Sequence, residues 1–228
     1  TELGIGQTAT LAVGLLDEHS GIDSGAAPTV EAIIGEQTFA FEQLQFTGAT
    51  WSGQLTIDTA MPSGSATVRI AGAIDGKSNI MAVFDTVEVF TLDTARPAVT
   101  GATPAMAASG VSVEVDEIDI TFSEALDPAT VISDNFQIHL GNSPLAQLSE
   151  PDYDETTNTV RLLPEGGLLP GSRYNIEVSA ALTDLAGNRP DDATTWSFST
   201  QVPALVETSP AAGALDATGD GRITATFD

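Results

Sequence analysis

The side chains of this sequence that could take part in chemistry are mostly carboxylates. The chain carries 32 Asp and Glu against 7 Lys and Arg, which gives a formal net charge of −25. Its two histidines, His19 in a predicted loop and His139 on a predicted strand, belong to no recognisable nucleophile or metal motif. With so many carboxylates, no pair can be singled out as the acid and base of a glycosidase. The sequence therefore predicts no enzymatic activity.

The acidic composition limits the partners of the chain. Nucleic-acid binding needs clustered Lys and Arg, and Lys77 is the only lysine, so we expect no nucleic-acid partner. An acidic surface can serve solubility, adaptation to salty surroundings or calcium binding, and all three stay open here. No apolar run approaches the roughly 20 residues of a membrane-spanning helix. Cysteine is absent, which excludes disulfides and thiol chemistry.

One local motif invites a calcium interpretation. Asp216-Ala-Thr-Gly-Asp-Gly-Arg222 places oxygen side chains at positions one, three and five of a loop and glycine at position six, as an EF-type calcium loop does. Position twelve would be Phe227, where that loop needs a carboxylate. We therefore favour a hairpin or plain loop here.

The elements that would hold any site are strands, because apolar residues recur with a period of two. About seven short strands are expected in the first hundred residues, and a similar set follows them. Turn clusters such as Ser20–Gly25 and Pro62–Gly64 separate the runs. Asp127-Pro128-Ala129-Thr130 is the only plausible helical turn, since Asp can cap it and Pro fits its first position. This pattern predicts an all-β chain of sandwiches.

An internal repeat sets the expected boundaries. Pro97–Pro104 recurs as Pro203–Pro210, and Ile120-Thr-Phe122 recurs within Ile223–Phe227, at a spacing of about 106 residues. We therefore predict one domain over residues 1–95, a second over 96–202, and the first strands of a third over 203–228. No basic region followed by an apolar one opens the sequence, so we expect a mature or excised segment.

Residues 97–200 carry a series of motifs that extends over about 100 residues and opens with P-x-V-x-x-x-x-P. The other motifs are Ile120-Thr-Phe-Ser-Glu-Ala-Leu-Asp127-Pro, Leu168-Leu-Pro-Gly-Ser-Arg-Tyr174, Thr183-Asp-Leu-Ala-Gly-Asn188 and Thr195-Trp-Ser-Phe-Ser-Thr200. Through these motifs, residues 97–200 resemble the bacterial Ig-like domain typified by surface-layer proteins. Residues 1–96 look like a related Ig-like repeat. The resemblance implies tandem immunoglobulin-like β-sandwiches, as found in bacterial adhesins and surface-layer proteins.

Three aromatic residues have structural interpretations. Tyr174 matches the tyrosine corner, in which the phenol hydroxyl bonds to backbone a few residues upstream. Trp51 and Trp196 could stack on a sugar ring, but each lies on an alternating strand, so we favour core packing. We expect Trp196, Phe198, Ile176 and Phe122 in the core of the second domain.

The Ig-like topology also predicts a calcium site. The loop after the second strand and the loop between the last two strands emerge at the pole where the chain enters, and hard oxygen ligands there suit six- to eight-coordinate Ca²⁺. The alternative is that Asp and Asn simply form solvated turns. The expected ligands are Asp93, Glu124, Asp127, Asp184, Asn188 and Asp191. Domain one repeats the arrangement with Asp17, Asp23 and Asp75.

The function expected from these features is that of a non-enzymatic structural spacer in an extracellular or bacterial cell-surface protein, of adhesin or surface-layer type, stiffened by calcium at domain junctions. Its expected partners are neighbouring Ig-like domains of the same chain, with self-assembly or a host or glycan surface as further options. An accessory region of a secreted carbohydrate-active enzyme and a glycan- or protein-binding module remain the alternatives.

Overall fold

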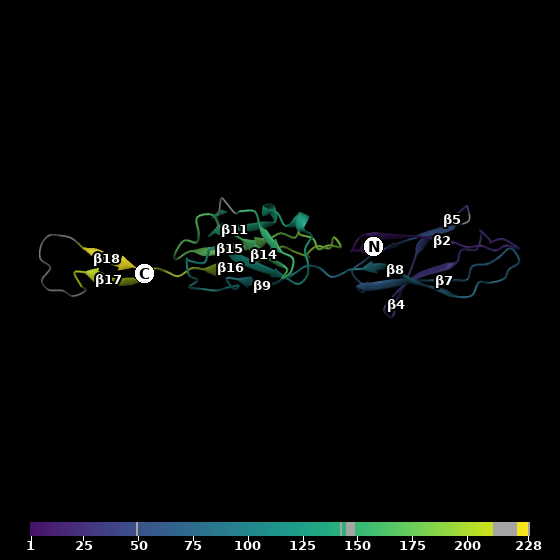
Figure 1. Cartoon of the computed structure of the whole chain (residues 1–228), viewed down its shortest axis with the longest axis horizontal. Coiled ribbons are helices and arrows are strands. Elements are labelled where there is room, and N and C mark those ends of the chain that lie inside the picture. The colour runs from purple at the N-terminus through teal and green to yellow at the C-terminus, as the bar shows by residue number, and fades with distance from the viewer. Residues whose placement is uncertain (49, 142, 145–148, 212–222, 228) are drawn as a thin grey trace. The chain divides into compact units, whose positions relative to one another are not determined.

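The computed structural model describes residues 1–48, 50–141, 143–144, 149–211 and 223–227. The predicted all-β class is confirmed, with 18 strands and two short 3-10 turns in the part of the chain that the structure describes. The backbone forms two compact units (Figure 1), the first made of residues 1–97 and 183–189 and the second of residues 98–182 and 190–228. Among the described residues, no helix is long and apolar enough to cross a membrane.

Unit 1 is a sandwich of two sheets. The larger sheet has the order β1-β8-β7-β3-β4 and the smaller one β2-β6-β5. All neighbours are antiparallel except β1 and β8, which run parallel. The strands are β1 (Glu2–Leu3), β2 (Thr8–Gly14), β3 (Thr29–Ile34), β4 (Gln37–Ala40), β5 (Glu42–Thr47), β6 (Thr50–Thr56), β7 (Gly64–Ala71) and β8 (Phe84–Leu92).

The period of two explains why these segments form a sandwich. In β3, Val30, Ala32 and Ile34 are buried while the residues between them are only partly buried, and β7 repeats the pattern. The inward residues of both sheets form one core, which includes Phe41, Trp51, Ile57 and Phe90. Trp51 is therefore a core residue, as expected.

Unit 2 is a second sandwich with two four-stranded sheets, β13-β14-β10-β9 and β12-β11-β15-β16. Its strands are β9 (Val99–Thr103), β10 (Ile118–Phe122), β11 (Phe136–Leu140), β12 (Ser143–Pro144), β13 (Asp152–Asp154), β14 (Thr159–Leu162), β15 (Arg173–Val178) and β16 (Thr194–Ser199). Phe122, Ile176 and Phe198 lie in its core as predicted. Trp196 is only half-buried and packs against that core from the edge strand β16.

The predicted helical turn forms as a 3-10 turn over Pro128–Thr130. The Asp127 carboxylate caps it by accepting a hydrogen bond from the Ala129 amide at 3.0 Å, and Pro128 occupies the first position. A second 3-10 turn, Ser133–Asn135, leads into β11 and was not expected from the sequence.

The last two strands, β17 (Leu205–Ser209) and β18 (Thr224–Phe227), form a separate antiparallel pair. Their register pairs Leu205 with Phe227, as Val99 pairs with Phe122 in β9 and β10. The repeat in sequence is thus also a repeat in strand pairing. That residues 203–228 open a third domain stays a prediction.

Candidate functional site

The six predicted calcium ligands are divided between the two units. Asp93, Asp184 and Asn188 lie in unit 1, and Glu124, Asp127 and Asp191 lie in unit 2. Within unit 1, a carboxylate oxygen of Asp93 and one of Asp184 lie within 4.8 Å of each other. The residue-183–189 loop thus brings two of the predicted ligands together.

The loop from Asp184 to Asn188 closes on itself through both ends. The Asn188 amide donates to Asp184 Oδ1 at 2.8 Å, the Asn188 side-chain Nδ2 donates to Asp184 Oδ2 at 2.8 Å, and the Asp184 amide donates to the Asn188 carbonyl at 3.1 Å. Both residues are only 2% exposed. A buried carboxylate is costly without hydrogen-bond donors, and Asn188 supplies two of them.

Asn188 also bonds to backbone of residues 1–97. Its Oδ1 accepts from the Ile5 amide at 2.6 Å, and its Nδ2 donates to the Asp93 carbonyl at 2.9 Å. Gln7 Nε2 donates to the Ala186 carbonyl at 2.7 Å. A side chain at Gly4 would collide with the Ala186 carbonyl, so this close approach requires glycine. We call the Gly4–Gln7 segment and Asp93 together the seat.

The site residues of unit 2 have structural contacts of their own. Asp127 caps the Pro128–Thr130 turn, as described above. Glu124 is half-buried, Asp191 is exposed, and each has an interaction partner. That these three side chains bind calcium stays a prediction. The EF-like segment 216–222 lies outside the described residues.

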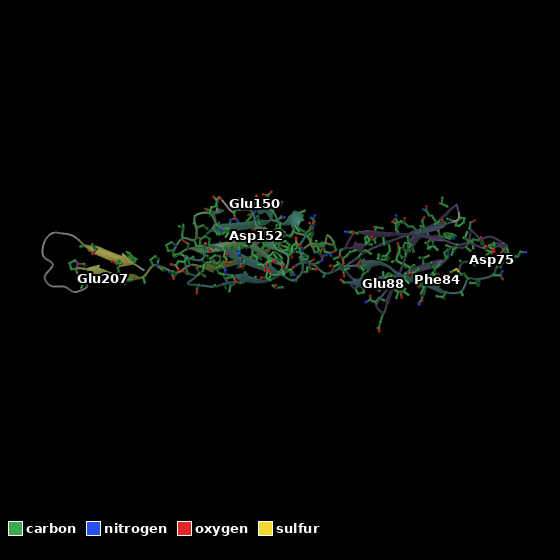
Figure 2. The ribbon with its side chains drawn as sticks, viewed as in Figure 1. Asp75, Phe84, Glu88, Glu150, Asp152 and Glu207 are labelled. Atoms are coloured by element: carbon green, nitrogen blue, oxygen red, sulfur yellow. The ribbon has the colours of Figure 1, made fainter. Side chains whose placement is uncertain are left out.

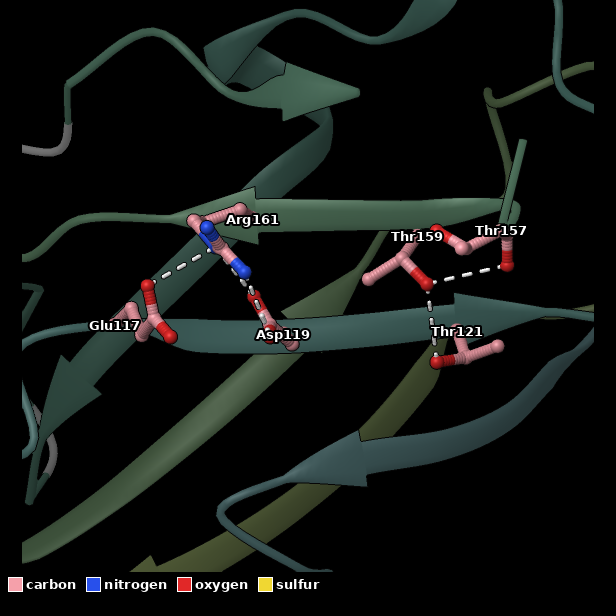
Figure 3. Close-up of polar contacts among 6 residues, drawn as sticks. All are labelled: Glu117, Asp119, Thr121, Thr157, Thr159 and Arg161. Carbon is pink, nitrogen blue, oxygen red and sulfur yellow. Dashed lines mark hydrogen bonds and ion pairs between the residues drawn. The ribbon is translucent and has the colours of Figure 1, made fainter. Parts of the chain in front are cut away.

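The outer face of β10 and β14 carries a polar ladder (Figure 3). Arg161 donates from Nε to Asp119 Oδ1 at 2.8 Å and from Nη2 to Asp119 Oδ2 at 3.2 Å, and its Nε lies 3.1 Å from Glu117 Oε2. The hydrogen bonds that Arg161 donates to Asp119, together with the negative charge of Asp119, raise the pKa of Arg161. Further along, Thr121 and Thr159 hydroxyls lie 3.3 Å apart across the strands. The ladder joins side chains that are direct neighbours across β10 and β14.

The acidic residues of domain one gather at another loop. Ser20 Oγ lies 2.8 Å from both Asp17 Oδ2 and Asp75 Oδ2, and Asp75 also accepts from the amide and side chain of Asn79. The Asn79 side chain, together with its amide, lowers the pKa of Asp75 well below the ordinary value. The backbone amide of His19 likewise lowers the pKa of Asp17. Asp23 instead accepts from the Gly25 amide at 2.8 Å.

The tyrosine corner is confirmed. Tyr174 is fully buried, its hydroxyl accepts a hydrogen bond from the Leu169 amide at 2.7 Å, and its ring stacks on Phe198 with centroids 5.4 Å apart. A second tyrosine bond was not expected: the Tyr153 hydroxyl accepts from the Leu126 amide at 2.7 Å. Its sequence signal was weak, because Tyr153 lies on a three-residue edge strand.

The histidines and tryptophans make few polar contacts among the described residues. His139 Nε2 lies 3.2 Å from Gln137 Oε1, and His19 lines a surface hollow of about 410 Å³. Trp51 and Trp196 each hold a buried indole N–H for which the described residues provide no acceptor. The carboxylates labelled in Figure 2 are spread over both units, with Asp75 and Glu88 in unit 1 and Glu150, Asp152 and Glu207 in unit 2.

In each unit a segment near the start of the sandwich pairs in parallel with the segment that closes it. In unit 1, β1 runs beside β8, and the Thr91 and Asp93 amides donate to the Thr1 and Leu3 carbonyls, both at 3.0 Å. In unit 2, Val111 bridges Thr200 in parallel. Four hydrogen bonds of 2.8 to 3.1 Å join residues 107–111 to residues 197–201.

A family model matches the second sandwich. Residues 93–200 match the model of the bacterial Ig-like domain. Curated proteins gave no match.

The solved structures to which the chain is similar include the following three. The N-terminal part of the bacterial S-layer protein SbsC is 23% identical over 50% of this chain and 26% of its own, with a TM-score of 0.38. The I9–I11 tandem from titin is 8% identical over 91% and 65%, with a TM-score of 0.43. Rst D1–D2 is 10% identical over 89% and 94%, with a TM-score of 0.35. The chain thus spans about a quarter of the SbsC structure.

Proposed function

We propose that this chain is a non-enzymatic spacer segment of a bacterial cell-surface or secreted protein, and that its Ig-like sandwiches carry tension along the polypeptide. The bacterial Ig-like domain at residues 93–200 supports the bacterial origin. The parallel pairing of an early segment with the closing segment of each unit supports the mechanical role.

The direction of pulling explains why this pairing matters. When tension acts on the two ends of unit 1, it pulls on the N-terminal end of β1 and on the C-terminal end of β8, in opposite directions along the strands. Because the two strands run parallel, they must slide past each other, so their hydrogen bonds resist together rather than opening one after another. Residues 107–111 and 197–201 give unit 2 the same arrangement.

The polar side chains also fit a structural role. The Tyr174 hydroxyl, the Asp127 carboxylate and the Asn188 amide are each used for hydrogen bonds to backbone. A catalytic site would instead point such groups at a reacting atom in a pocket. We therefore place any catalysis of the whole protein outside this segment.

We further propose that calcium strengthens the spacer through Asp93 and Asp184, with Glu124, Asp127, Asn188 and Asp191 as the other predicted ligands. Two oxygens on one Ca²⁺, each at about 2.4 Å, can be at most about 4.8 Å apart, which suits the separation of Asp93 and Asp184. Without an ion these two carboxylates repel each other, and the repulsion is stronger where one of them is buried. Asn188 Oδ1 already accepts from Ile5, so this residue would mainly orient Asp184.

The location of the protein tests the spacer proposal independently of mechanics. Antibodies against this segment should label intact producing cells or the secreted fraction. The same cells after permeabilisation provide the control for total antigen. Labelling that appears only after permeabilisation would reject an extracellular role.

A further inference from the structure

The loop Asp75–Asn79 has the same internal hydrogen bonds as the loop Asp184–Asn188. Asn79 donates from its amide to Asp75 Oδ1 at 2.7 Å and from Nδ2 to Asp75 Oδ2 at 2.6 Å. The Asp75 amide donates to the Asn79 carbonyl at 3.0 Å. Each of these three bonds has its counterpart in the other loop, at 2.8, 2.8 and 3.1 Å. The chain thus builds one D-x-x-x-N loop twice.

The two copies differ in what surrounds them. Asn188 is buried in the seat, where it bonds to Ile5 and Asp93. Asn79 is exposed, and no described residue donates a hydrogen bond to its Oδ1. Asn188 uses its Oδ1 and Nδ2 to bond to backbone, whereas the corresponding atoms of Asn79 face solvent.

Large apolar side chains lie beside the exposed copy, next to acidic ones. The hollow of about 410 Å³ beside it is lined by Leu16, Ile80 and Met81 as well as by Asp75 and Asn79, and Asp17 and Glu18 also line it. Leu16 is 91% exposed and Ile80 71% exposed. Large apolar side chains with so much exposure next to unused hydrogen-bonding groups mark a surface that a partner covers.

We infer that the Asp75–Asn79 loop, with Leu16 and Ile80, docks into the seat of another Ig-like repeat, as the Asp184–Asn188 loop docks into the seat formed by Gly4–Gln7 and Asp93. Asn79 Oδ1 accepts from the backbone amide that corresponds to Ile5, and Asn79 Nδ2 donates to the carbonyl that corresponds to Asp93. The inference rests on the proposed role as a repeat in a spacer, and it names the surface by which one repeat recognises the next.

A second copy of this chain is the probe for the inference. In the wild type the seat is filled by the chain's own Asn188 loop, so the wild type is expected to stay monomeric. Asn188→Ala removes the side chain that bonds to the Ile5 amide and the Asp93 carbonyl, and so frees these two groups of the seat. The Asn79 loop of one molecule can then dock into the seat of the next, and such a head-to-tail contact gives dimers and longer chains as the concentration rises.

Sedimentation equilibrium up to about 1 mM protein measures this association. We expect the average mass of Asn188→Ala to rise with concentration, and Asn79→Ala in that background to weaken the association roughly tenfold or more, since two hydrogen bonds are lost. Ile80→Glu provides a variant that leaves the Asp75–Asn79 hydrogen bonds in place, and it should weaken association too.

The outcomes separate this inference from the spacer proposal. If Asn188→Ala stays monomeric up to this concentration while it retains its β-sheet circular dichroism, the docking role is overturned. Association that survives both Asn79→Ala and Ile80→Glu would place the contact elsewhere and overturn it as well. Neither result changes the expected surface labelling of cells, which tests the spacer proposal on its own.

Discussion

Replacing Tyr174 with Phe removes the hydroxyl of the tyrosine corner and keeps the ring. In the wild type that hydroxyl accepts a hydrogen bond from the Leu169 amide at 2.7 Å, and the fully buried ring stacks on Phe198. The variant retains the ring packing, so the change in unfolding free energy reports the hydrogen bond. An amide left without its acceptor costs about 1 to 3 kcal/mol. Leu169 is half exposed, so water can reach part of this segment and the lower end of the range is expected.

The two tryptophans make the assay specific for one unit. Trp51 lies in unit 1 and Trp196 in unit 2, so the emission of Trp196 in a Trp51→Phe background follows unit 2 alone. For a domain of about 100 residues, 1 kcal/mol corresponds to roughly 4 to 8 °C in melting temperature. Tyr174→Phe should therefore lower the Trp196 transition by at least about 4 °C. The Trp51 transition, read in a Trp196→Phe background, should not move.

Two results would refute this reasoning. An unchanged Trp196 transition would mean that the Tyr174 hydroxyl contributes no net stability. An equal shift in the Trp51 transition would mean that the substitution acts on the whole chain rather than on the corner. Tyr153→Phe, which removes the bond to the Leu126 amide, is the matched substitution in the same unit and should give a loss of similar size.

Three further predictions follow from the loops. Asn188→Ala should lower the free energy of unfolding in urea by about 2 to 4 kcal/mol, because Asp184 loses one of its two donors from Asn188 and the Ile5 amide and Asp93 carbonyl each lose a partner. A change below about 0.5 kcal/mol would contradict this. Millimolar Ca²⁺ should raise the melting temperature of the wild type more than that of Asp184→Ala, and an equal response of the two would exclude this site. Hydrogen bonds lower the pKa of Asp75 in the folded state. The ionised Asp75 carboxylate therefore stabilises the fold fully above about pH 4, and this stabilisation is lost as the pH falls further. Asp75→Asn should therefore weaken the fall of the urea unfolding midpoint as the pH decreases from 5 to 2. If the midpoint of the variant falls as steeply as that of the wild type, the Asp75 carboxylate is not responsible.

Much of the fold follows from the period of two. Strands such as β3 and β7 bury alternate residues, so their position and inward face could be predicted from sequence. β4 and β5 could not, because Gln37–Ala40 and Glu42–Thr47 lie at sheet edges and leave most of their side chains in solvent.

The candidate site was predictable in its residue types but not in how their atoms are used. Asp and Asn offer oxygen to a metal ion, and the same oxygen can accept a backbone hydrogen bond. Asn188 uses its oxygen for the Ile5 amide, a contact between residues 183 positions apart that no local pattern indicates. The duplicate at Asp75–Asn79 was named only for its carboxylate, because the likeness of the two loops lies in their hydrogen bonds.

Pulling single molecules by their two ends tests the tension-bearing role most directly. Each sandwich should resist and then unfold in one step, releasing roughly 300 to 350 Å of chain, since about 100 residues extend at about 3.4 Å each. Two such steps are expected per molecule, and replacing Val111 by Pro, which removes the amide that donates to Ser199, should lower the force of one step and leave the other unchanged. A chain that extends smoothly without two discrete steps, or a Val111→Pro variant with unaltered forces, would contradict the proposal that these sandwiches bear load through their parallel terminal segments.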